Sequence, residues 1–382
     1  MNLKKIIPIL EWLPNYNKSL FKDDLVAGII VGIILIPQGI AYALIAGLPP
    51  IYGLYCALVP QVMYAIFGSS RQVAIGPVAM DSLIVATGVS TLALAGSDSY
   101  ISIAILLALL VGLIQFFMGV FRLGFVVNFL SKPVITGFTS AIALIIGLNQ
   151  FGNLFGIDFT QSDQIQHLIK NIWGQLANYS SHTTLIGCFS IVLIVIFRKI
   201  NKKIPNALIV VILGILVIKY FGKSLGDVSI IRDIPSGLPS FGVPNFDIDQ
   251  IRELLPIALT LVMVGYLETI SIGKSLEAKQ EEYRIRPNQE LIALGLSNLV
   301  GSLFQAYPIS SSFSRSAVNQ ESGGKTGMAA LISVVMVLLT VLFFTPLFYH
   351  LPKTVLAAII IVAVFGLINI KEALYLLKVN HL

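Results

Sequence analysis

Charged side chains are scarce in this chain, and that scarcity argues against a water-soluble fold. Asp, Glu, Lys and Arg make up 12% of the 382 residues, whereas 56% are hydrophobic and the mean hydropathy is +0.88. A soluble domain usually carries about twice that share of charged residues. A soluble core of this size could not hide so much apolar surface from water, whereas a membrane protein leaves it in contact with lipid. The composition therefore predicts an integral membrane protein.

Cysteine and histidine are also few, which argues against metal and enzyme sites. Cys56 and Cys188 lie inside apolar segments, and their spacing suits neither a disulfide framework nor a metal site. The four histidines fall in predicted loops or chain ends, and the sequence has no HExxH zinc motif and no phosphate-binding loop. We therefore expect no enzyme activity, no metal and no resident cofactor.

The start of the chain lacks the features of a secretory signal peptide. Glu11 and Pro14 interrupt the short apolar stretch that follows the first lysines, and no small-residue cleavage site comes after it. Residues 1–22 are therefore interpreted as a cytoplasmic, interfacial lead-in. Residues 23–382 are interpreted as a transmembrane domain without a soluble domain.

Long apolar segments are what the sequence has in abundance. A helix needs about 20 apolar residues to cross the hydrocarbon layer of a membrane, and twelve candidate segments are predicted. The third and tenth are too short, or too polar at their starts, to be ordinary spans. The segments lie near residues 25–46, 51–67, 76–95, 101–121, 133–151, 183–198, 206–221, 253–275, 288–305, 312–322, 326–347 and 353–369.

Lysine and arginine concentrate in alternate connections between these segments. The short connections near 47–51, 96–100 and 306–311 contain neither residue, whereas the connections between them do. Basic loops favour the cytoplasmic side, so we expect a multi-pass protein of the cell inner (plasma) membrane with a cytoplasmic N-terminus. The same pattern explains the net charge of +6 without a nucleic-acid partner. An amphipathic stretch over 165–176 is expected to lie at the membrane surface.

The third and tenth segments share an unusual design. Residues 72–75 suit an extended strand, and Gly76 and Pro77 follow, where proline is pre-set for the first turn of a helix. Three serines at 310–312 precede the tenth segment and suit the cap of a helix N-terminus. Each unit is therefore predicted to be a short extended piece followed by a half-helix.

These half-helices are expected to enter from opposite sides, so their N-termini would meet near the midplane of the membrane. A helix N-terminus carries about half a positive charge and several unpaired N–H donors. Facing N-termini form an anion site built mostly from backbone. Interrupted segments in matching positions of two halves indicate the binding site of a transporter. The alternative is that both segments are packing features without a ligand.

Ionisable residues within the apolar segments mark the same region. Arg315 lies in the first turn of the second half-helix and would add fixed positive potential, unless it pairs with a carboxylate or extends to the interface. Glu268, in the eighth segment, would exchange a proton, or bind a sodium ion together with Ser271, or serve as a structural partner of Arg315. Asp81, one turn into the first half-helix, opposes an anion and is expected to face the scaffold. Segments one and eight also match weakly in register, with Gln38 opposite Glu268, as an inverted repeat would leave them.

Longer motifs at these positions resemble a known family. The runs from Pro37 to Tyr55 and from Phe67 to Ala79 resemble the SulP sulfate permease family, also called solute carrier family 26, and the run from Ser314 to Thr326 is similar to its second hallmark. The resemblance covers nearly the whole chain. It implies an all-α polytopic membrane protein with a seven-plus-seven inverted-repeat transporter fold, in which core and gate domains include two half-helices preceded by short strands. Family members have fourteen spans and then a STAS domain, so this chain is expected to be truncated after about twelve segments.

The resemblance also assigns repeats and a site. Residues 23–221 would form the first inverted repeat and residues 253–382 an incomplete second one. Glu268 matches an acidic position of proton-coupled members, so Glu268 and Ser271 are expected to bind the coupling ion, H⁺ or Na⁺. Val78 stands where several animal members have an aromatic residue, which leaves the anion preference open. Carried over by position, the substrate-binding residues are Gln38, Tyr42, Val78, Ala79, Phe313, Ser314 and Arg315.

Together these observations predict a secondary active transporter of inorganic anions. Proton-coupled sulfate uptake is the leading hypothesis, because Arg315 favours a divalent anion and the resemblance assigns proton coupling to Glu268. The alternatives are sodium-coupled bicarbonate transport, an uncoupled chloride or other anion channel, and a nucleobase carrier of the same fold. The resemblance implies a homodimer in the lipid bilayer that works by an elevator-like motion.

Overall fold

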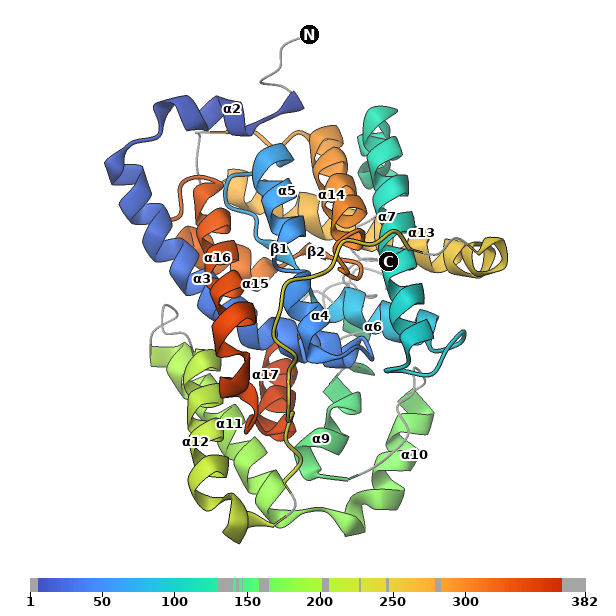
Figure 1. The fold of residues 1–382 in the computed structure, drawn as a ribbon, viewed down its shortest axis with the longest axis vertical. Coiled ribbons are helices and arrows are strands. Elements are labelled where there is room, and N and C mark those ends of the chain that lie inside the picture. Colours follow the sequence, from blue (N-terminus) through green and yellow to red (C-terminus); the bar gives the residue numbers. More distant parts are fainter. Residues whose placement is uncertain are drawn as a thin grey trace, which may run out of the picture. The chain divides into compact units, whose positions relative to one another are not determined.

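Apolar helices account for most of the chain in the computed structural model (Figure 1). Among the residues that the structure describes, five helices are long and apolar enough to cross a membrane. The predicted fifth segment, 133–151, lies largely outside the described residues. The structure describes residues 6–129, 140–141, 144–145, 147–157, 165–200, 206–226, 228–244, 247–278 and 283–365.

The chain divides into two compact units. Unit 1 combines residues 1–127 with 235–344, and unit 2 combines residues 128–234 with 345–382. Unit 1 contains α2 (Ile9–Trp12), a 3₁₀ helix (Leu13–Asn15), α3 (Lys18–Ile45), α4 (Pro50–Tyr55), α5 (Val59–Phe67), β1 (Ile75–Gly76), α6 (Ala79–Val89), α7 (Asp98–Val120), a 3₁₀ helix at its boundary (Leu123–Phe129), α13 (Ile248–Glu277), α14 (Pro287–Ser302), β2 (Ser310–Ser311), α15 (Phe313–Glu321), α16 (Met328–Leu339) and a π-helical turn (Thr340–Phe344).

Helix caps explain where these helices differ from their predicted bounds. The Asn17 side chain accepts hydrogen bonds from the backbone N–H groups of Ser19 and Leu20, both at 3.0 Å, so α3 begins at Lys18 instead of near residue 25. Asp247 caps α13 in the same way and starts it at Ile248 instead of residue 253. Such N-caps satisfy orphan backbone donors and fix the first residue of a helix.

Small residues allow the helices of unit 1 to pack closely. A Cβ added to Gly112 or to Gly295 would overlap the backbone of the facing helix, because α7 and α14 approach each other at these points. A Cβ on Gly28 would overlap the side chain of Ile332, where α3 approaches α16. Glycine at a helix–helix contact is the usual means of close packing in lipid, where backbones must approach for van der Waals contact. The arrangement fixes the helices that surround the two half-helices.

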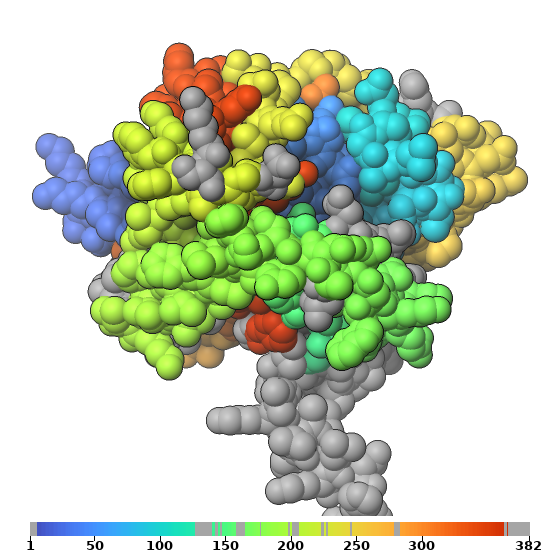
Figure 2. All heavy atoms as spheres, turned by 90° about the horizontal axis from the view of Figure 1, so that it is seen from below, coloured from blue at the N-terminus to red at the C-terminus, as the bar shows by residue number. Residues whose placement is uncertain are grey.

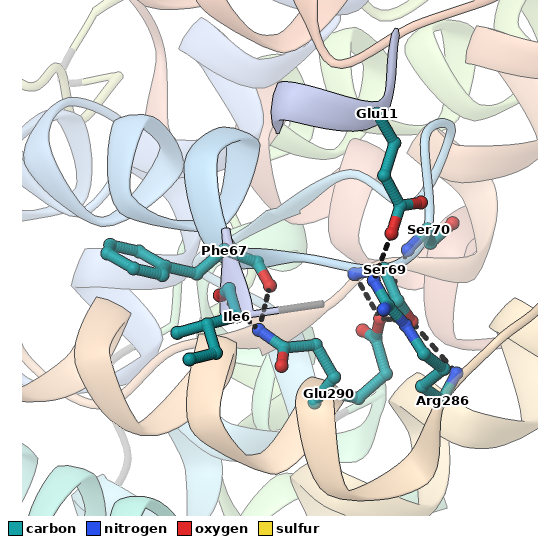
Figure 3. A network of polar contacts seen from close by, with 8 residues as sticks. Ile6, Glu11, Phe67, Ser69, Ser70, Arg286 and Glu290 are labelled. Carbon is teal, nitrogen blue, oxygen red and sulfur yellow. Dashed lines mark hydrogen bonds and ion pairs between the residues drawn. The ribbon is translucent and has the colours of Figure 1, made fainter. Parts of the chain in front are cut away.

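A polar network at one end of unit 1 anchors the connection that leads into β1 (Figure 3). The buried Glu290 carboxylate accepts hydrogen bonds from the Tyr64 hydroxyl at 2.5 Å, from the Ser69 N–H at 2.8 Å and hydroxyl at 2.6 Å, and from the Ser70 N–H at 3.1 Å. The Ser69 hydroxyl in turn accepts from the Arg286 N–H at 2.9 Å, and the Arg286 guanidinium pairs with Glu11 at 3.2 Å. One carboxylate thereby ties the residues after α5 to the start of α14.

Unit 2 consists of the remaining described helices. Thr354 joins three of them, because its hydroxyl donates to the carbonyl oxygens of Leu154 at 3.3 Å and Thr183 at 3.2 Å. The predicted amphipathic stretch is confirmed as a helix, α10. The helices are α9 (Phe151–Phe155), α10 (Ile165–Gln175), a 3₁₀ helix (Leu176–Asn178), α11 (Ser181–Ile200), α12 (Asn206–Leu225), a 3₁₀ helix (Thr345–Phe348) and α17 (Lys353–Phe365).

Unit 2 exposes an apolar helix face. The side chains of α10, α11 and α12, coloured green to lime, gather on the face seen in Figure 2. On α11 the exposed apolar residues Leu185, Phe189, Val192 and Ile196 recur at helical spacing. Such a stripe on a membrane helix is suited to contact with lipid or with another helix.

Candidate anion site between two half-helices

The two predicted extended pieces pair with each other. β1 and β2 are antiparallel, with Ile75 opposite Ser311 and Gly76 opposite Ser310. α6 begins three residues after β1 and α15 two residues after β2, so both helix starts lie within about 10 Å of the paired strands, since a residue spans at most about 3.6 Å. The expectation that these N-termini meet therefore agrees with the geometry. α6 starts at Ala79, two residues after Pro77, because Gly76 is part of the strand.

Side chains of the neighbouring helices fix the segment around β2. Asn298 of α14 accepts a hydrogen bond from the Ile309 N–H at 2.9 Å and donates to the Ile309 carbonyl at 3.1 Å. The hydroxyl groups of Ser311 and Thr269 of α13 are 2.5 Å apart. Within the described residues β2 pairs only with β1, so the Asn298 side chain provides hydrogen bonds that a neighbouring strand would supply in a larger sheet.

The segment around β1 is held by α15. Ser316 accepts a hydrogen bond from the Ala74 N–H at 2.9 Å, and Asn319 donates to the Gln72 carbonyl at 2.9 Å. The Ser312 N–H donates to the Ala74 carbonyl at 2.9 Å. The half-helix that follows one strand therefore fixes the position of the other strand.

The two helix N-termini differ in their caps. The Ser312 hydroxyl accepts from the Arg315 N–H at 3.4 Å, as the serine run predicts. Val78, which precedes α6, provides no side-chain acceptor among the described residues. The first N–H groups of α6 are therefore donors that an anion can use.

Arg315 is the charged centre of this region. It is the third residue of α15 and its side chain is 0% exposed. Its Nη1 donates to Oε1 of Gln38 at 3.1 Å, whereas its Nε and Nη2 have no hydrogen-bond acceptor within the described part of the chain. No ion pair described for these residues involves Arg315. A buried guanidinium with free donors is suited to bind an anion.

A glycine in β1 makes room for this guanidinium. Gly76 has a φ of +141°, which disfavours any residue with a side chain. A Cβ built at this position would lie 3.3 Å from Nη2 of Arg315. The strand therefore brings its backbone directly against the charge.

The other predicted substrate residues fall into two groups. Gln38 and Tyr42 of α3 are one turn apart and buried, and Tyr42 interacts electrostatically with Arg315. Val78 and Ala79 are buried at the start of α6. In contrast, Phe313 and Ser314 are exposed in the first turn of α15. That all seven bind substrate stays a prediction.

The predicted coupling residues lie on α13. The Glu268 carboxylate is partly buried and accepts a hydrogen bond from the Ser310 hydroxyl of β2 at 3.4 Å. Ser271 is exposed and makes no side-chain hydrogen bond in the described part. Asp81 of α6 is buried, its Oδ1 atom has no hydrogen-bond partner among the described residues, and its charge interacts electrostatically with Glu268. Sequence reasoning left Asp81 out of the site, although its place in the first turn of a half-helix was the available signal.

Solved structures share this fold. The chain matches the structure of the murine Solute Carrier 26 family member A9 anion transporter in the inward-facing state with a TM-score of 0.91 and 28% identity, over 98% of this chain and 65% of that one. It matches the transmembrane domain of the cyanobacterium bicarbonate transporter BicA with a TM-score of 0.83 and 23% identity, over 93% of this chain and 91% of that one. These likenesses confirm the predicted all-α polytopic membrane fold with inverted-repeat core and gate architecture.

Curated relatives are similar along the whole chain. "Sulfate transporter 4.1, chloroplastic" of Arabidopsis thaliana is 41% identical over 98% of this chain and 56% of its own length. The "Sodium-independent sulfate anion transporter" of Bos taurus is 35% identical over 100% of this chain and 67% of its own length. The chain thus spans little more than half the length of the first relative. The profile of the Sulfate permease family matches residues 21–382, and the chain belongs to this family of multi-pass membrane proteins.

Proposed function

We propose that this chain is a secondary active anion transporter that couples the uptake of sulfate to protons. The observation that carries the proposal is the pairing of β1 with β2, which brings two helix N-termini together beside the buried Arg315. The anion would bind to the free donors of Arg315 and to the first N–H groups of α6 and α15. Gln38 and Tyr42 would orient the guanidinium from α3.

Physical chemistry supports an inorganic oxyanion as the ligand. Backbone N–H groups and a guanidinium donate hydrogen bonds and accept none, so they match a ligand that carries acceptors only. Both helix dipoles place positive potential at the same point. A buried arginine without an acidic partner is costly unless an anion compensates for it. Sulfate has four oxygen acceptors and two negative charges, and therefore fits this set of donors.

The relatives support sulfate and protons over the other ions. Sequences 35–41% identical to this chain are named as sulfate transporters, and the bovine one is named as sodium-independent. These relatives are transporters by name, which also supports the prediction that the chain is not an enzyme. The likeness to BicA, at 23% identity, is evidence for the fold only. Bicarbonate is therefore included as a competing anion in the test, and sulfate is the proposed substrate.

Uptake into liposomes tests the proposal. The purified chain is reconstituted, and labelled sulfate is followed with and without an inward proton gradient, with and without a sodium gradient, and against excess chloride or bicarbonate. Accumulation of sulfate that depends on the proton gradient supports the proposal. Sodium-driven bicarbonate uptake without sulfate uptake would replace it with the bicarbonate alternative, and passive chloride flux alone would indicate a channel.

The homodimer, the plasma membrane and the extents of the two repeats are part of the same proposal. Light scattering of the purified chain in detergent measures the mass of the assembly. A homodimer predicts twice the 41.4 kDa of one chain after subtraction of the detergent. A single-chain mass would argue against the dimer and leave the anion site unaffected.

A further inference from the structure

A buried serine on β2 contacts the predicted coupling residue directly. Ser310 is 1% exposed, and its hydroxyl donates a hydrogen bond to Oε2 of Glu268 on α13 at 3.4 Å. Gly265 precedes Glu268 by three residues, so both lie on the same face of α13. A Cβ added to Gly265 would lie 3.0 Å from the Cβ of Ser310. One face of α13 therefore holds Ser310 both at its Cβ and at its hydroxyl.

The backbone of the same serine leads to the anion site. Ser310 stands opposite Gly76 in the pairing of β2 with β1. Gly76 lies against the guanidinium of Arg315, because a Cβ at this glycine would be 3.3 Å from Nη2. Nη1 of the same guanidinium donates to Gln38 at 3.1 Å. A continuous chain of contacts thus runs from Glu268 to the anion site, and such chains transmit coupling when one of their contacts has two arrangements.

The contact between Ser310 and Glu268 has two arrangements, because it depends on the protonation of the carboxyl group. An ionised carboxylate can only accept hydrogen bonds, and a bond to a charged acceptor is about twice as strong as one between neutral groups. Protonation of Glu268 therefore weakens the hydrogen bond that Ser310 donates. The O–H group of the protonated carboxyl can then donate to Ser310 instead.

Charged groups on the helices packed against α13 also act on this region. Asp81 of α6 acts on Glu268 electrostatically, and Arg315 of α15 is reached through Ser310 and Gly76. The other charged residues of these helices lie nearer the helix ends: Asp98 on α7, Glu290 on α14, Glu321 on α15, and Asp249, Arg252, Glu253, Lys274 and Glu277 on α13 itself. A substitution of Ser310 leaves all of these charges in place, so its effect on a pH dependence cannot come from a lost charge.

We propose that Ser310 is the positioning residue that couples a proton on Glu268 to the anion beside Arg315. The proposal rests on the proton-coupled function proposed above and names the residue that links its two sites. While Glu268 is ionised, Ser310 holds β2 to α13 by a charge-assisted hydrogen bond. When a proton from water binds to a carboxylate oxygen of Glu268, this bond weakens, and the paired strands can adjust the position of Gly76 against the guanidinium. Release of the proton to water restores the first arrangement, and no other covalent bond is made or broken.

Linkage between proton and sulfate defines the signature of this role. In a symporter the proton raises the affinity for sulfate, and bound sulfate raises the affinity for the proton by the same factor, which is typically about 5- to 150-fold for coupled sites. The affinity for sulfate then falls from one plateau to another as pH rises through the titration of Glu268. Loss of the Ser310 hydroxyl alone can move the midpoint of this transition, because Glu268 loses a donor. Loss of coupling through Ser310 instead reduces the ratio of the two plateau affinities.

Titration calorimetry of Ser310→Ala measures this ratio. The purified chain is titrated with sulfate at a series of pH values on both sides of the transition. The plateau ratio is expected to be about 5-fold or more in the unmodified chain and about twofold or less in Ser310→Ala. In liposomes, accumulation of labelled sulfate driven by a proton gradient is expected to fall in parallel. Ser310→Cys keeps a weaker donor of similar size, so its plateau ratio is expected to lie between the two, and it decides the question if Ser310→Ala does not fold.

The neighbouring serine provides the matched control. The Ser311 hydroxyl also contacts α13, but its partner is Thr269 and not Glu268. Ser311→Ala is therefore expected to keep the plateau ratio of the unmodified chain, even where it lowers the unfolding temperature. A ratio that falls equally in Ser310→Ala and Ser311→Ala would overturn the proposal and indicate a general loosening of β2. An unchanged ratio in Ser310→Ala, with only a moved midpoint or a weaker affinity at every pH, would also overturn it.

Two further results separate this role from the proton coupling on which it rests. Glu268→Gln keeps the group neutral and is expected to abolish the pH dependence of sulfate binding. A pH dependence that persists in Glu268→Gln would assign the proton to another group and overturn the role of Ser310. An unmodified chain whose sulfate affinity does not change with pH, and whose uptake does not respond to a proton gradient, would overturn the proposed proton coupling itself, and the role of Ser310 with it.

Discussion

At the scale of single residues, the proposed anion site depends on the guanidinium of Arg315. Arg315→Ala is expected to weaken sulfate binding about tenfold or more, since a charged hydrogen bond contributes about 1.5 to 3 kcal/mol and 1.4 kcal/mol corresponds to tenfold. Titration calorimetry of the purified protein measures the effect. Arg252→Ala, which removes an arginine whose side chain is 78% exposed on α13, is the matched control. Equal affinities for sulfate in the unmodified protein and in Arg315→Ala would make Arg315 a structural residue.

Because Arg315 is buried, its replacement has a second expected effect. Gln38 loses its donor in Arg315→Ala and is left unsatisfied. Arg315→Lys keeps a positive charge, with its N–H donors on a single nitrogen atom, but lacks the planar fork of the guanidinium. It is therefore expected to fold better than Arg315→Ala and to bind sulfate more weakly than the unmodified protein.

A second residue-scale prediction concerns the backbone next to that charge. Gly76→Ala places a Cβ 3.3 Å from Nη2 of Arg315 on a residue with a φ of +141°, so it is expected to weaken sulfate binding and to lower the unfolding temperature. Gly96 has a φ of +80° and open space around it. Gly96→Ala is therefore the control that measures only the loss of stability caused by a side chain at positive φ. Equal sulfate affinities in the two variants would mean that the contact with Arg315 has no influence on binding.

At the scale of elements, the short strands depend on the network around Glu290. The Glu290 carboxylate accepts four hydrogen bonds. In Glu290→Gln one carboxylate oxygen becomes an NH₂ group, which cannot accept a hydrogen bond from the donors that surround it. We expect a loss of about 1–3 kcal/mol in the free energy of unfolding, measured as a lower unfolding temperature in detergent. Glu253→Gln, an exposed acidic residue on α13, is the control and is expected to change the unfolding temperature little. An unchanged temperature in Glu290→Gln would show that the α5–β1 connection is held by other contacts.

Helix packing in unit 1 gives another prediction at this scale. Gly295→Val introduces a branched side chain where even a Cβ overlaps the backbone of Phe116 on α7. The two helices would have to separate, so folded protein is expected to be largely lost, as measured by size-exclusion chromatography. Gly222→Val on α12, where a Cβ meets only one atom at 3.5 Å, is expected to give normal yields.

The elements also show what the sequence could and could not predict. The half-helices and the serine cap of α15 follow from local rules of helix initiation, which nearby residues satisfy. The register of β1 with β2 does not, because it joins segments more than two hundred residues apart and is set by side chains such as Asn298 and Ser316. The contact of Ser310 with Glu268 could not be predicted for the same reason: a helix period gives the face of a residue but not its partner.

At the scale of the whole molecule, the basic connections gather at one end of unit 1. Asp24 accepts a hydrogen bond from the Lys325 N–H at 2.7 Å, and the Gly124 N–H donates to Asn288 at 2.8 Å. The chain segments that these hydrogen bonds join, and the segments joined by the Glu290 network, are the ones that the sequence predicts to be cytoplasmic. At the opposite end, the Tyr100 hydroxyl donates to the Ala46 carbonyl at 2.7 Å, and both connections there lack lysine and arginine. The alternation of charge in the sequence therefore corresponds to two ends of the folded unit.

This separation predicts which end faces the cytoplasm. Basic residues are retained on the cytoplasmic side during insertion, so the end with Arg284 is expected inside and the connection with Ser99 outside. In a Cys188→Ser background, which removes the exposed native cysteine, a membrane-impermeant maleimide added to intact cells is expected to label Ser99→Cys at once. Arg284→Cys, equally exposed at the opposite end, is expected to react only after the cells are permeabilised. The reverse pattern would place the N-terminus outside, and the proton gradient would then have to act on the anion site from the other side of the membrane.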